Sequence, residues 1–478
     1  MNFRLVLNVV GRVMLIESAA MLLPVCVALI YQEPLFPFLG SAAVMLLLGC
    51  GLTLIPSNKQ FYSREGFFAV GLIWLLTCFT GALPFWLSGE FDSFVDCFFE
   101  SCSGFTTTGA SILTDIEALS QGILFWRSFT HWLGGMGVLV LTSAIIPSMG
   151  IRSKYLTQAE SPGPVFSKLV PKQSQTSKIL YGIYCALTLL EAFILKLAGM
   201  SFFDAFIHAF GTAGTGGFSN RNASVGAYDS PAIEMIIAIF ILLFSINFAT
   251  HFLLLCGKFR EVLKSDELLF FLAVVGCSTI AIMLNIRPQY PDLLQAFRYA
   301  FFQVSSIIST TGFASTDWSY WPQFSQMILV LLMFCGACAG STGGGIKCSR
   351  ILILMRCAHR EIHQITHPRS VQVVRLDGKP LEESTLHSVM IFIGSYITII
   401  LGAALIISLD DFSFAVSFTS ALTAVSNVGP GVEIVGPAGN FSILSDLSKI
   451  VMSLCMIVGR LEILPILVLL SRGAWCRI

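Results

Sequence analysis

One segment of the chain, residues 94–109, reads FVDCFFESCSGFTTTG. It joins an aromatic amphipathic stretch to a short turn of threonine and glycine, within otherwise strongly apolar sequence. The same succession returns three more times, twice as a closely similar turn and once in a diverged form. The four turns are Thr107-Thr108-Gly109, Thr215-Gly216-Gly217, Thr310-Thr311-Gly312 and Asn427-Val428-Gly429.

Phenylalanines precede the last glycine of each turn at matched distances. Eleven residues before it stand Phe98, Phe206, Phe301 and Phe418, and fifteen residues before it stand Phe94, Phe202, Phe297 and Phe414. Such a register indicates an internal repeat of about a hundred residues, present four times. Four polar glycine turns in one apolar chain suggest a pore with pseudo-fourfold symmetry.

The composition is that of an integral membrane protein. Hydrophobic residues make up 55% of the 478 residues and charged residues 12%, against roughly 25% charged residues in soluble domains. Lysine plus arginine equals aspartate plus glutamate at 28 each, so no overall field recruits nucleic acid.

Ten runs are long enough to cross the hydrocarbon of a bilayer, which predicts an all-α membrane fold. The four later pairs of runs each enclose one phenylalanine-marked stretch and one turn. We expect a half-helix that enters the membrane and returns as a loop, because non-helical backbone at that depth must line water or be buried in protein. The predicted spans are 5–30, 37–55, 66–87, 123–148, 178–199, 230–256, 268–286, 325–355, 386–408 and 447–471.

Each repeat is therefore predicted as helix, pore helix, filter loop and helix. The expected divisions are a leading helix pair (1–60), pore repeat 1 (61–155), pore repeat 2 (156–262), pore repeat 3 (263–365) and pore repeat 4 (366–478).

Basic residues concentrate in the connections 56–65, 149–177, 257–267 and 347–384. Because cytoplasmic loops carry the excess of lysine and arginine, we expect these loops and both termini in the cytoplasm and the turns open to the outside. The outer side offers chiefly carboxylates, with scattered Arg127, Arg221 and Arg287. Those carboxylates either concentrate cations or are simply solvated.

The turns have the residues that a cation filter needs. Backbone carbonyls aimed at one axis can replace the water of a monovalent cation without a net charge that would trap it. Pointing successive carbonyls the same way requires positive φ angles, which glycine reaches at little steric cost. Threonine hydroxyls, or the Asn427 amide oxygen, can add further oxygen ligands to this row of carbonyls. All twelve turn residues are thus predicted filter residues.

These residues resemble the Trk/Ktr/HKT superfamily of potassium transporters, and within it the bacterial Trk-type potassium uptake subunit. The resemblance covers essentially the whole chain, including Gly340-Ser341-Thr342-Gly343-Gly344-Gly345-Ile346-Lys347 and Gly459-Arg460-Leu461-Glu462. It implies one potassium filter in a single chain, in which a glycine at the third position of every turn accompanies preference for potassium over sodium. The fourth turn departs most, because Asn427 and Val428 replace threonines.

The resemblance also implies a homodimer in the bacterial plasma membrane, regulated by a cytosolic ring that binds nucleotides such as NAD or ATP. The chain has no nucleotide-binding motif of its own, and we expect it to bind no cofactor. Two polar, basic segments offer docking surface, Gln158 to Lys178 and Cys357 to Glu383.

The helix after the third turn breaks at Gly340 to Gly345, because glycine costs a helix about 1 kcal/mol each relative to alanine. By resemblance this is a loop that blocks the pore below the filter and moves to open it. The alternative is a tight crossing of helices through small residues, with Lys347 close behind.

Arg460 lies within the last apolar run, where a charge must face protein or water. By distance from the glycines, Arg460, Gly344 and Asn247 fall at one level on the cytoplasmic side of the filter. Arg460 is interpreted as an electrostatic barrier in the conduction path, which the resemblance supports. The alternative is a simple pairing with Glu462 or with carbonyl oxygens.

Two further motifs leave alternatives open. His359, His363 and His367 share a helix face at a spacing that can chelate metal, but without a completing carboxylate or cysteine we expect no transition-metal site. Glu100 either bonds the first filter loop or faces the outer vestibule.

The leading function, with the resemblance, is channel-like potassium uptake, with the glycine loop and Arg460 as barriers. Symport with protons or sodium would need a carboxylate relay, which Glu17, Glu191 and Glu234 do not obviously form. A membrane enzyme is disfavoured, because no catalytic motif is present.

Overall fold

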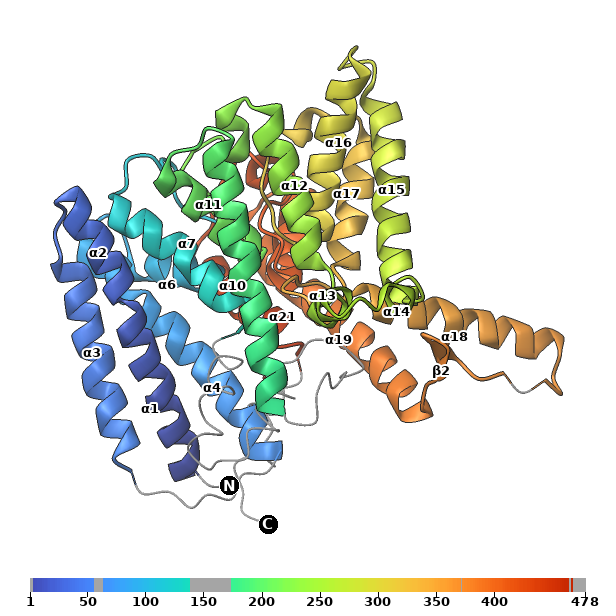
Figure 1. Ribbon diagram of the computed structural model, residues 1–478, viewed down its shortest axis with the longest axis horizontal. Helices are drawn as coiled ribbons and strands as arrows, with labels where there is room; N and C mark the ends of the chain where they lie inside the picture. Colours follow the sequence, from blue (N-terminus) through green and yellow to red (C-terminus); the bar gives the residue numbers. More distant parts are fainter. Residues whose placement is uncertain (1–2, 56–62, 138–172, 371, 464–465, 467–478) are drawn as a thin grey trace.

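The structure, a computed structural model, describes residues 3–55, 63–137, 173–370, 372–463 and 466. It is built almost entirely of helices, as the sequence predicted (Figure 1). The described strands are the two-residue pair β1 (Arg375–Leu376) and β2 (Lys379–Pro380). The α-helices are α1 (Phe3–Ala20), α2 (Leu22–Tyr31), α3 (Phe36–Thr53), α4 (Ser63–Gly81), α5 (Leu83–Ser88), α6 (Phe94–Phe105), α7 (Gln121–Gly135), α10 (Gln173–Leu197), α11 (Phe202–Gly214), α12 (Pro231–Ser245), α13 (Phe248–Leu255), α14 (Phe259–Val262), α15 (Asp266–Ile286), α16 (Leu293–Ile308), α17 (Gln323–Cys335), α18 (Cys348–Thr366), α19 (Glu383–Ile407), α20 (Phe414–Ser426) and α21 (Asp446–Arg460).

The leading helices α1, α2 and α3 lie at one edge of the molecule (Figure 1). Small residues bring α1 and α3 together: a Cβ on Gly11 would lie 2.9 Å from the carbonyl oxygen of Gly49. The Asn8 side chain donates to the Thr53 carbonyl oxygen at 2.7 Å. Close backbone approach of this kind is how helices associate where apolar surroundings supply no hydrophobic drive. The group joins the rest through α1 against α4 and α2 against α7.

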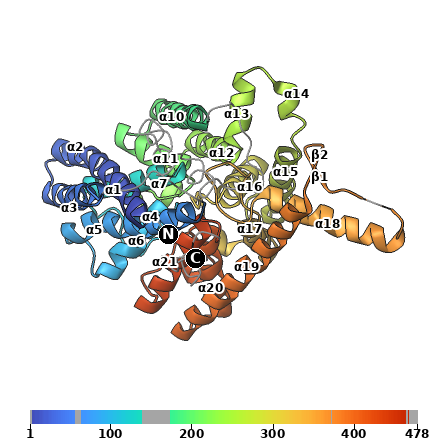
Figure 2. The ribbon, with the colours of Figure 1, turned by 90° about the horizontal axis from the view of Figure 1, so that it is seen from below.

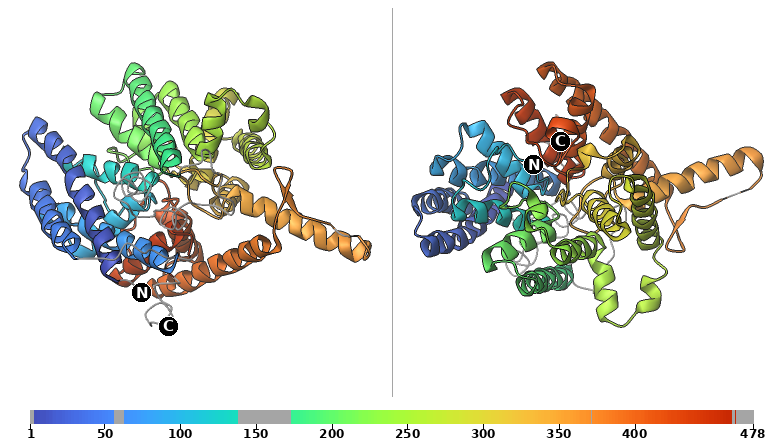
Figure 3. Two further views of the ribbon diagram at one scale, coloured as in Figure 1. Left: turned by 60° about the horizontal axis from the view of Figure 1, so that its bottom comes forward. Right: turned by 90° about the horizontal axis from the view of Figure 1, so that it is seen from above.

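The other helices form four groups around a common centre, seen from above and below in Figures 3 and 2. Each group has a first helix, a short helix that ends at one of the four turns, and a second helix. The groups contact one another in a closed cycle, because α7 packs on α11, α12 on α16, α17 on α20, and α21 on α6. A cycle of four contacts is what the predicted pseudo-fourfold arrangement requires. The residue boundaries of the repeats stay a prediction.

Six described helical segments are long and apolar enough to cross a membrane. They coincide with six of the ten predicted spans and include the first helix of every repeat. The six segments are Phe3–Tyr31, Phe36–Thr53, Glu65–Ser88, Ser177–Leu197, Asp266–Ile286 and Glu383–Asp410.

The second helix of every repeat ends early instead of running on. α7, α12 and α21 have 15 residues each and α17 has 13. The expected single span 230–256 is a pair of helices bent by 97°, because the Asn247 side chain accepts the Ala249 N–H at 2.8 Å and starts α13 in a new direction. The break that the sequence predicted in the third repeat is present, between α17 and α18. The unbroken span predicted in the second repeat was wrong. The total of ten spans stays a prediction.

Helix α18 projects from the body of the molecule (Figures 1 and 2). Ion pairs hold its base: Arg356 bonds Asp266 at 2.8 Å and Arg360 bonds Glu383 at 2.6 Å. The Glu383 hydrogen bond raises the pKa of the Arg360 guanidinium above its usual value. Of the three histidines predicted to share a helix face, His363 and His367 have stacked rings with centroids 4.6 Å apart. The described residues contain no cluster of three or more potential metal ligands.

Candidate functional site

Each of the four short helices, α6, α11, α16 and α20, is capped at its start and ends within two residues of a turn. Ser93, Ser201 and Ser413 accept the backbone N–H three residues further on, and Asp292 accepts that of Leu294. The caps satisfy N–H groups that a helix start leaves unpaired. Because the C-terminal end of a helix is partially negative, four such ends at the turns favour a cation there.

The four turns share one backbone conformation. Their first residues, three threonines and Asn427, have φ between 55° and 64°, and their glycines have φ between 78° and 100°. The middle residues do not have positive φ. Each middle N–H donates to the carbonyl five residues earlier, at 2.8 to 3.0 Å, which is the Schellman ending of a helix. The predicted alternation into positive φ is therefore present in all four turns.

The glycines bring the four turns together as a closed ring. A Cβ placed on Gly109 would lie 1.9 Å from the carbonyl oxygen of Gly216, which belongs to the next turn. The same holds around the ring: a Cβ on Gly217 would meet the Thr311 oxygen at 2.0 Å, one on Gly312 the Val428 oxygen at 2.2 Å, and one on Gly429 the Thr108 oxygen at 2.7 Å. Each glycine thus leaves room for the middle carbonyl of its neighbour, and the fourth turn returns to the first.

Such a ring can coordinate a cation with oxygen atoms only. Carbonyl oxygens from four chain segments around one axis can replace a hydration shell. Among the first residues of the turns, the side-chain oxygens of Thr107 and Asn427 have no hydrogen-bond partner in the described part of the chain. The Asn427 nitrogen instead donates to Thr108 Oγ1 and to the Met456 carbonyl, both at 2.9 Å. The diverged fourth turn is thereby tied to the first turn and to α21.

A buried ion pair braces the first two turns from behind. Glu100 and Arg127 are 0% and 2% exposed and their side chains approach to 2.5 Å. Glu100 also accepts from Ser111 Oγ and from the Ile112 N–H, so it bonds the first filter loop. Arg127 donates to the Ser219 carbonyl, beyond the second turn, at 2.8 Å. The Arg127 charge is therefore neutralised inside the protein, and its position on the outer side stays a prediction.

The segment between α17 and α18 is an irregular loop packed against the third and fourth turns. A Cβ on Gly343 would lie 2.6 Å from the Ser309 carbonyl oxygen, and one on Gly344 would lie 2.4 Å from that of Ser426. The Gly344 N–H donates to Thr310 Oγ1 at 2.6 Å, which is a direct bond between loop and filter turn. Because the segment is not helical, the alternative of a tight helix crossing does not describe it.

The other side of this loop rests on the break of the second repeat. The Phe248 N–H donates to the Gly340 carbonyl at 3.1 Å, and Thr342 Oγ1 donates to the Phe244 carbonyl at 3.2 Å. The backbone of the loop itself is held by Lys347, which is 2% exposed, has φ 80° and donates to the Gly343 carbonyl. The Ser341 hydroxyl turns back to the Cys338 carbonyl at 2.6 Å.

Arg460 joins the loop to the first repeat. Its guanidinium donates to the Thr342 carbonyl at 2.7 Å, to the Gly134 carbonyl at 2.5 Å and to the Gly135 carbonyl at 2.7 Å. Of the pairing alternatives, the carbonyl one is present. Glu462 instead forms an ion pair with Arg350 of α18. A positive charge therefore lies between the C-terminal end of α7, the C-terminal end of α21 and the loop. This agrees with the prediction that Arg460 and Gly344 lie at the same depth below the filter.

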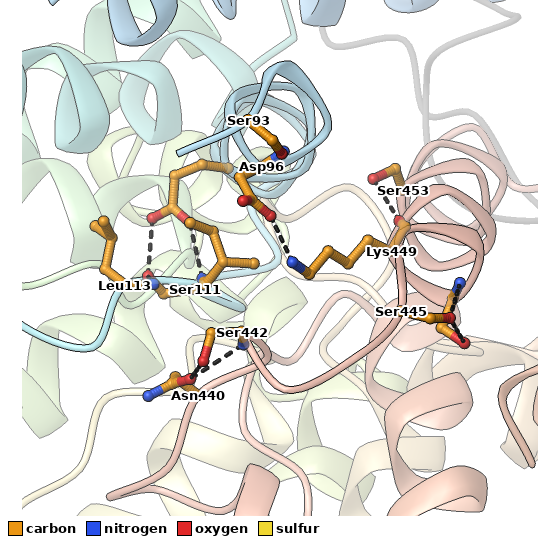
Figure 4. Close-up of polar contacts among 12 residues, drawn as sticks. Ser93, Asp96, Ser111, Leu113, Asn440, Ser442, Ser445, Lys449 and Ser453 are labelled. Carbon is orange, nitrogen blue, oxygen red and sulfur yellow. Dashed lines mark hydrogen bonds and ion pairs between the residues drawn. The ribbon is translucent and has the colours of Figure 1, made fainter. Parts of the chain in front are cut away.

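A second buried ion pair closes the cycle of repeats between α6 and α21. Lys449 Nζ lies 2.6 Å from Asp96 Oδ1, with the two side chains 8% and 12% exposed (Figure 4). Sequence reasoning did not single out this pair. The sequence did contain a signal for it, because a charged residue inside a membrane helix is energetically costly unless it is paired. Both a lysine and an aspartate occur in such helices here.

Of the two predicted docking surfaces, Gln158 to Lys178 lies mostly outside the described residues. The surface from Cys357 to Glu383 is described apart from residue 371 and carries exposed apolar side chains. They include Ile362, Ile365 and Val373.

Comparison with known proteins gives consistent matches over the whole length. The profile of a family described as TrkH, cation transport protein, matches residues 38–473. The Trk system potassium uptake protein TrkH of Escherichia coli (strain K12) is 38% identical over 99% of this chain and 100% of its own length. The protein TrkG of the same strain is 34% identical over 99% of both. The crystal structure of the potassium transporter TrkH from Vibrio parahaemolyticus superimposes with a TM-score of 0.89 at 34% identity, covering 100% of both chains.

Proposed function

This chain belongs to the TrkH family of cation transport proteins, and we propose that it takes up potassium through the ring of its four turns. The family and its relatives are transporters rather than enzymes. The substrate is the potassium ion, held by Thr107-Thr108-Gly109, Thr215-Gly216-Gly217, Thr310-Thr311-Gly312 and Asn427-Val428-Gly429 as a filter.

The closed ring of glycines and carbonyls carries this proposal. In each turn the third residue must be glycine for two independent reasons, a positive φ and a neighbouring carbonyl within 2.7 Å of any Cβ. Both constraints serve to bring four carbonyls around one axis, which is the geometry a dehydrated monovalent cation needs. Neither constraint would be needed to pack an ordinary membrane helix bundle.

The residues below the ring are proposed as its gate. Gly340 to Gly345 and Lys347 form the loop that bonds the third turn, and Arg460 places a positive charge beside that loop. A cation leaving the ring on this side would meet both. The distribution of basic loops supports a cytoplasmic location for the gate and for both termini, with the ring open to the outside.

The variant Gly312→Ser tests the filter assignment. Gly312 has φ 83°, and a Cβ there would lie 2.2 Å from the Val428 carbonyl oxygen and 2.8 Å from Pro430 Cδ. We expect a loss of potassium preference over sodium in proteoliposome flux assays. Gly276→Ser is the matched control, because Gly276 lies in the same repeat, on an exposed face of α15, where a Cβ would meet nothing within 4 Å beyond its chain neighbours and its own helix backbone. An unchanged potassium preference in Gly312→Ser would overturn the filter assignment for this repeat.

Coupled symport is the second candidate, and the placement of the intramembrane carboxylates does not favour it. Glu17 on α1 bonds Thr80 at 3.2 Å and Glu234 on α12 pairs with Arg298 at 3.1 Å. Glu191 lies on a third helix, α10. In the described residues no hydrogen bond or ion pair links these three carboxylates to each other or to a filter turn. Potassium flux that requires a proton gradient would support symport.

The exposed surfaces support proposals for the partners of this chain. Exposed apolar side chains on α3 and α15, such as Leu47 and Leu284, suit contact with lipid. The projecting α18 and the segment from Cys357 to Glu383 suit a cytosolic regulatory ring that binds NAD or ATP, within a homodimer of this chain. Deleting residues 367–380 should abolish regulation by such a ring while the purified protein keeps its potassium selectivity.

A further inference from the structure

The four turns differ in what supports their middle residue from behind. In the first and third turns the support is a contact between two hydroxyls, one on the middle residue and one on the residue just before the turn. Thr106 Oγ1 lies 2.8 Å from Thr108 Oγ1, and Ser309 Oγ lies 2.7 Å from Thr311 Oγ1. These are the middle residue and the residue two positions before it, so the two turns carry the same brace.

The second turn lacks both hydroxyls, because the two equivalent positions are Gly214 and Gly216. The ring of His131, from α7, occupies the space where a side chain of Gly216 would lie. A Cβ on Gly216 would meet His131 Cγ at 2.3 Å, Nδ1 at 2.4 Å and Cδ2 at 2.5 Å, and these are its three nearest atoms. Gly216 does not have a positive φ, so its backbone conformation does not demand glycine. The imidazole therefore excludes a side chain there.

His131 is itself held firmly in this place. The residue is 0% exposed, and Nδ1 lies 2.7 Å from the Gly104 carbonyl oxygen, at the end of the first pore helix. Since a carbonyl can only accept, Nδ1 carries the proton of this bond. The opposite contact is with Phe218, just after the second turn, at 4.1 Å between ring centroids. Arg127 covers Phe218 at 3.6 Å. The imidazole therefore spans from the first pore helix to the second filter turn.

The fourth turn repeats the principle with another residue. Its middle residue is Val428, which has no hydroxyl, and the residue two positions before it is Ser426. The Ser426 hydroxyl lies 2.5 Å from the hydroxyl of Tyr396, a fully buried residue of α19. Both turns without an internal hydroxyl pair are thus supported by a ring from another helix.

We propose that His131 is a positioning residue of the ion filter, which sets the place of the Gly216 carbonyl by filling the space behind the second turn. The proposal rests on the proposed function of the four turns. The Gly216 carbonyl is the oxygen that lies against Gly109 in the ring. Movement of the second turn into the space of the imidazole would withdraw that oxygen and widen one quarter of the ring.

A compensation experiment tests the proposal. His131→Ala empties the space, Gly216→Ser overfills it, and the double variant refills it with a side chain of the turn itself. We expect each single variant to lower the potassium-to-sodium flux ratio by at least about twofold, the low end of the coupling between contacting residues. The double variant should recover most of the loss, because the three atoms nearest to a Gly216 Cβ all belong to the imidazole.

Two further variants separate the functions of the imidazole. His131→Phe keeps a ring behind Gly216 but cannot donate to Gly104, and His131→Asn can donate but leaves most of the space empty. We expect His131→Phe to keep the larger share of the selectivity. The matched control is Phe129→Ala, which removes a buried ring of α7 that packs on Phe125, Trp132 and Phe210. It should lower the melting temperature without changing the flux ratio.

The outcomes distinguish this proposal from the filter assignment. If Gly312→Ser changes selectivity while His131→Ala leaves it unchanged, His131 only fills the core and the proposal is wrong. The proposal is also wrong if the effects of the two single variants simply add in the double variant. If Gly312→Ser changes nothing, the filter assignment of the third repeat itself fails.

Discussion

Arg460 offers the sharpest test of the gate, because one side chain joins three segments. Its bond to the Thr342 carbonyl is the one that holds the loop, whereas the bonds to Gly134 and Gly135 hold the guanidinium in place. Opening the loop must break the first bond and can leave the other two intact. Replacing Arg460 by alanine removes this latch and the positive charge together.

The size of the effect follows from that one bond. A hydrogen bond to a charged group contributes about 1.5–3 kcal/mol, and about 1.4 kcal/mol is a factor of ten in an equilibrium. Losing it should therefore shift the ratio of open to closed loop by about 10- to 150-fold. The remaining loop bonds, from Gly344 to Thr310 and from Thr342 to Phe244, keep the shift finite.

The assay is potassium flux into proteoliposomes with the purified chain alone. We expect Arg460→Ala to raise the flux within that range and to leave the potassium-to-sodium ratio unchanged, since the turns keep their contacts. Arg460→Lys separates two causes, because lysine retains the charge but cannot donate to three carbonyls in the same geometry. High flux in both variants assigns the effect to the latch, and high flux in alanine alone assigns it to the charge. A folded Arg460→Ala protein with unchanged or lower flux would refute the reasoning.

Two other contacts give further predictions. Thr310→Val removes the acceptor of the Gly344 N–H, which leaves a buried donor unpaired and destabilises the closed loop by about 1–3 kcal/mol. Potassium flux should therefore rise about 5- to 150-fold. The control is Thr398→Val, on an exposed face of α19, which should not change the flux. Equal flux in Thr310→Val and wild type would contradict the bond between loop and filter. Lys449→Met strands the Asp96 carboxylate and should destabilise the protein by about 3–5 kcal/mol, while Asp96→Leu with Lys449→Met should regain most of that loss. Thermal unfolding in detergent measures both, and a double variant no more stable than the single one would count against the ion pair.

Much of the filter could be predicted from sequence because its requirements are local. Positive φ, a Schellman ending and a capped helix depend on residues within about one helical turn, and the same residue types recur in every repeat. The phenylalanine register marked the four pore helices for the same reason. Six long helices could be placed because a span is also a local property of about 20 residues.

The breaks in the second helices were predicted less well. In the third repeat three consecutive glycines gave a local signal. In the second repeat the bend depends on the Asn247 cap and on the Gly340 loop, whose backbone receives the Phe248 N–H. The sequence placed Asn247 at the level of Gly344 and Arg460, but the apolar residues on both sides did not indicate a bend, because hydropathy reports burial in lipid or protein and not helix continuity.

The sequence by itself determined the number of turns, their backbone conformation and the membrane setting, since each is set by neighbours along the chain. Tertiary structure alone decided how the turns close into a ring and which side chains hold them. Gly109 meets Gly216, His131 fills the space behind Gly216, and Arg460 bonds Gly134 across 326 residues. Such contacts depend on where distant segments meet. From the sequence one can infer that a charged residue or a histidine in an apolar run needs a partner, but not which residue that partner is.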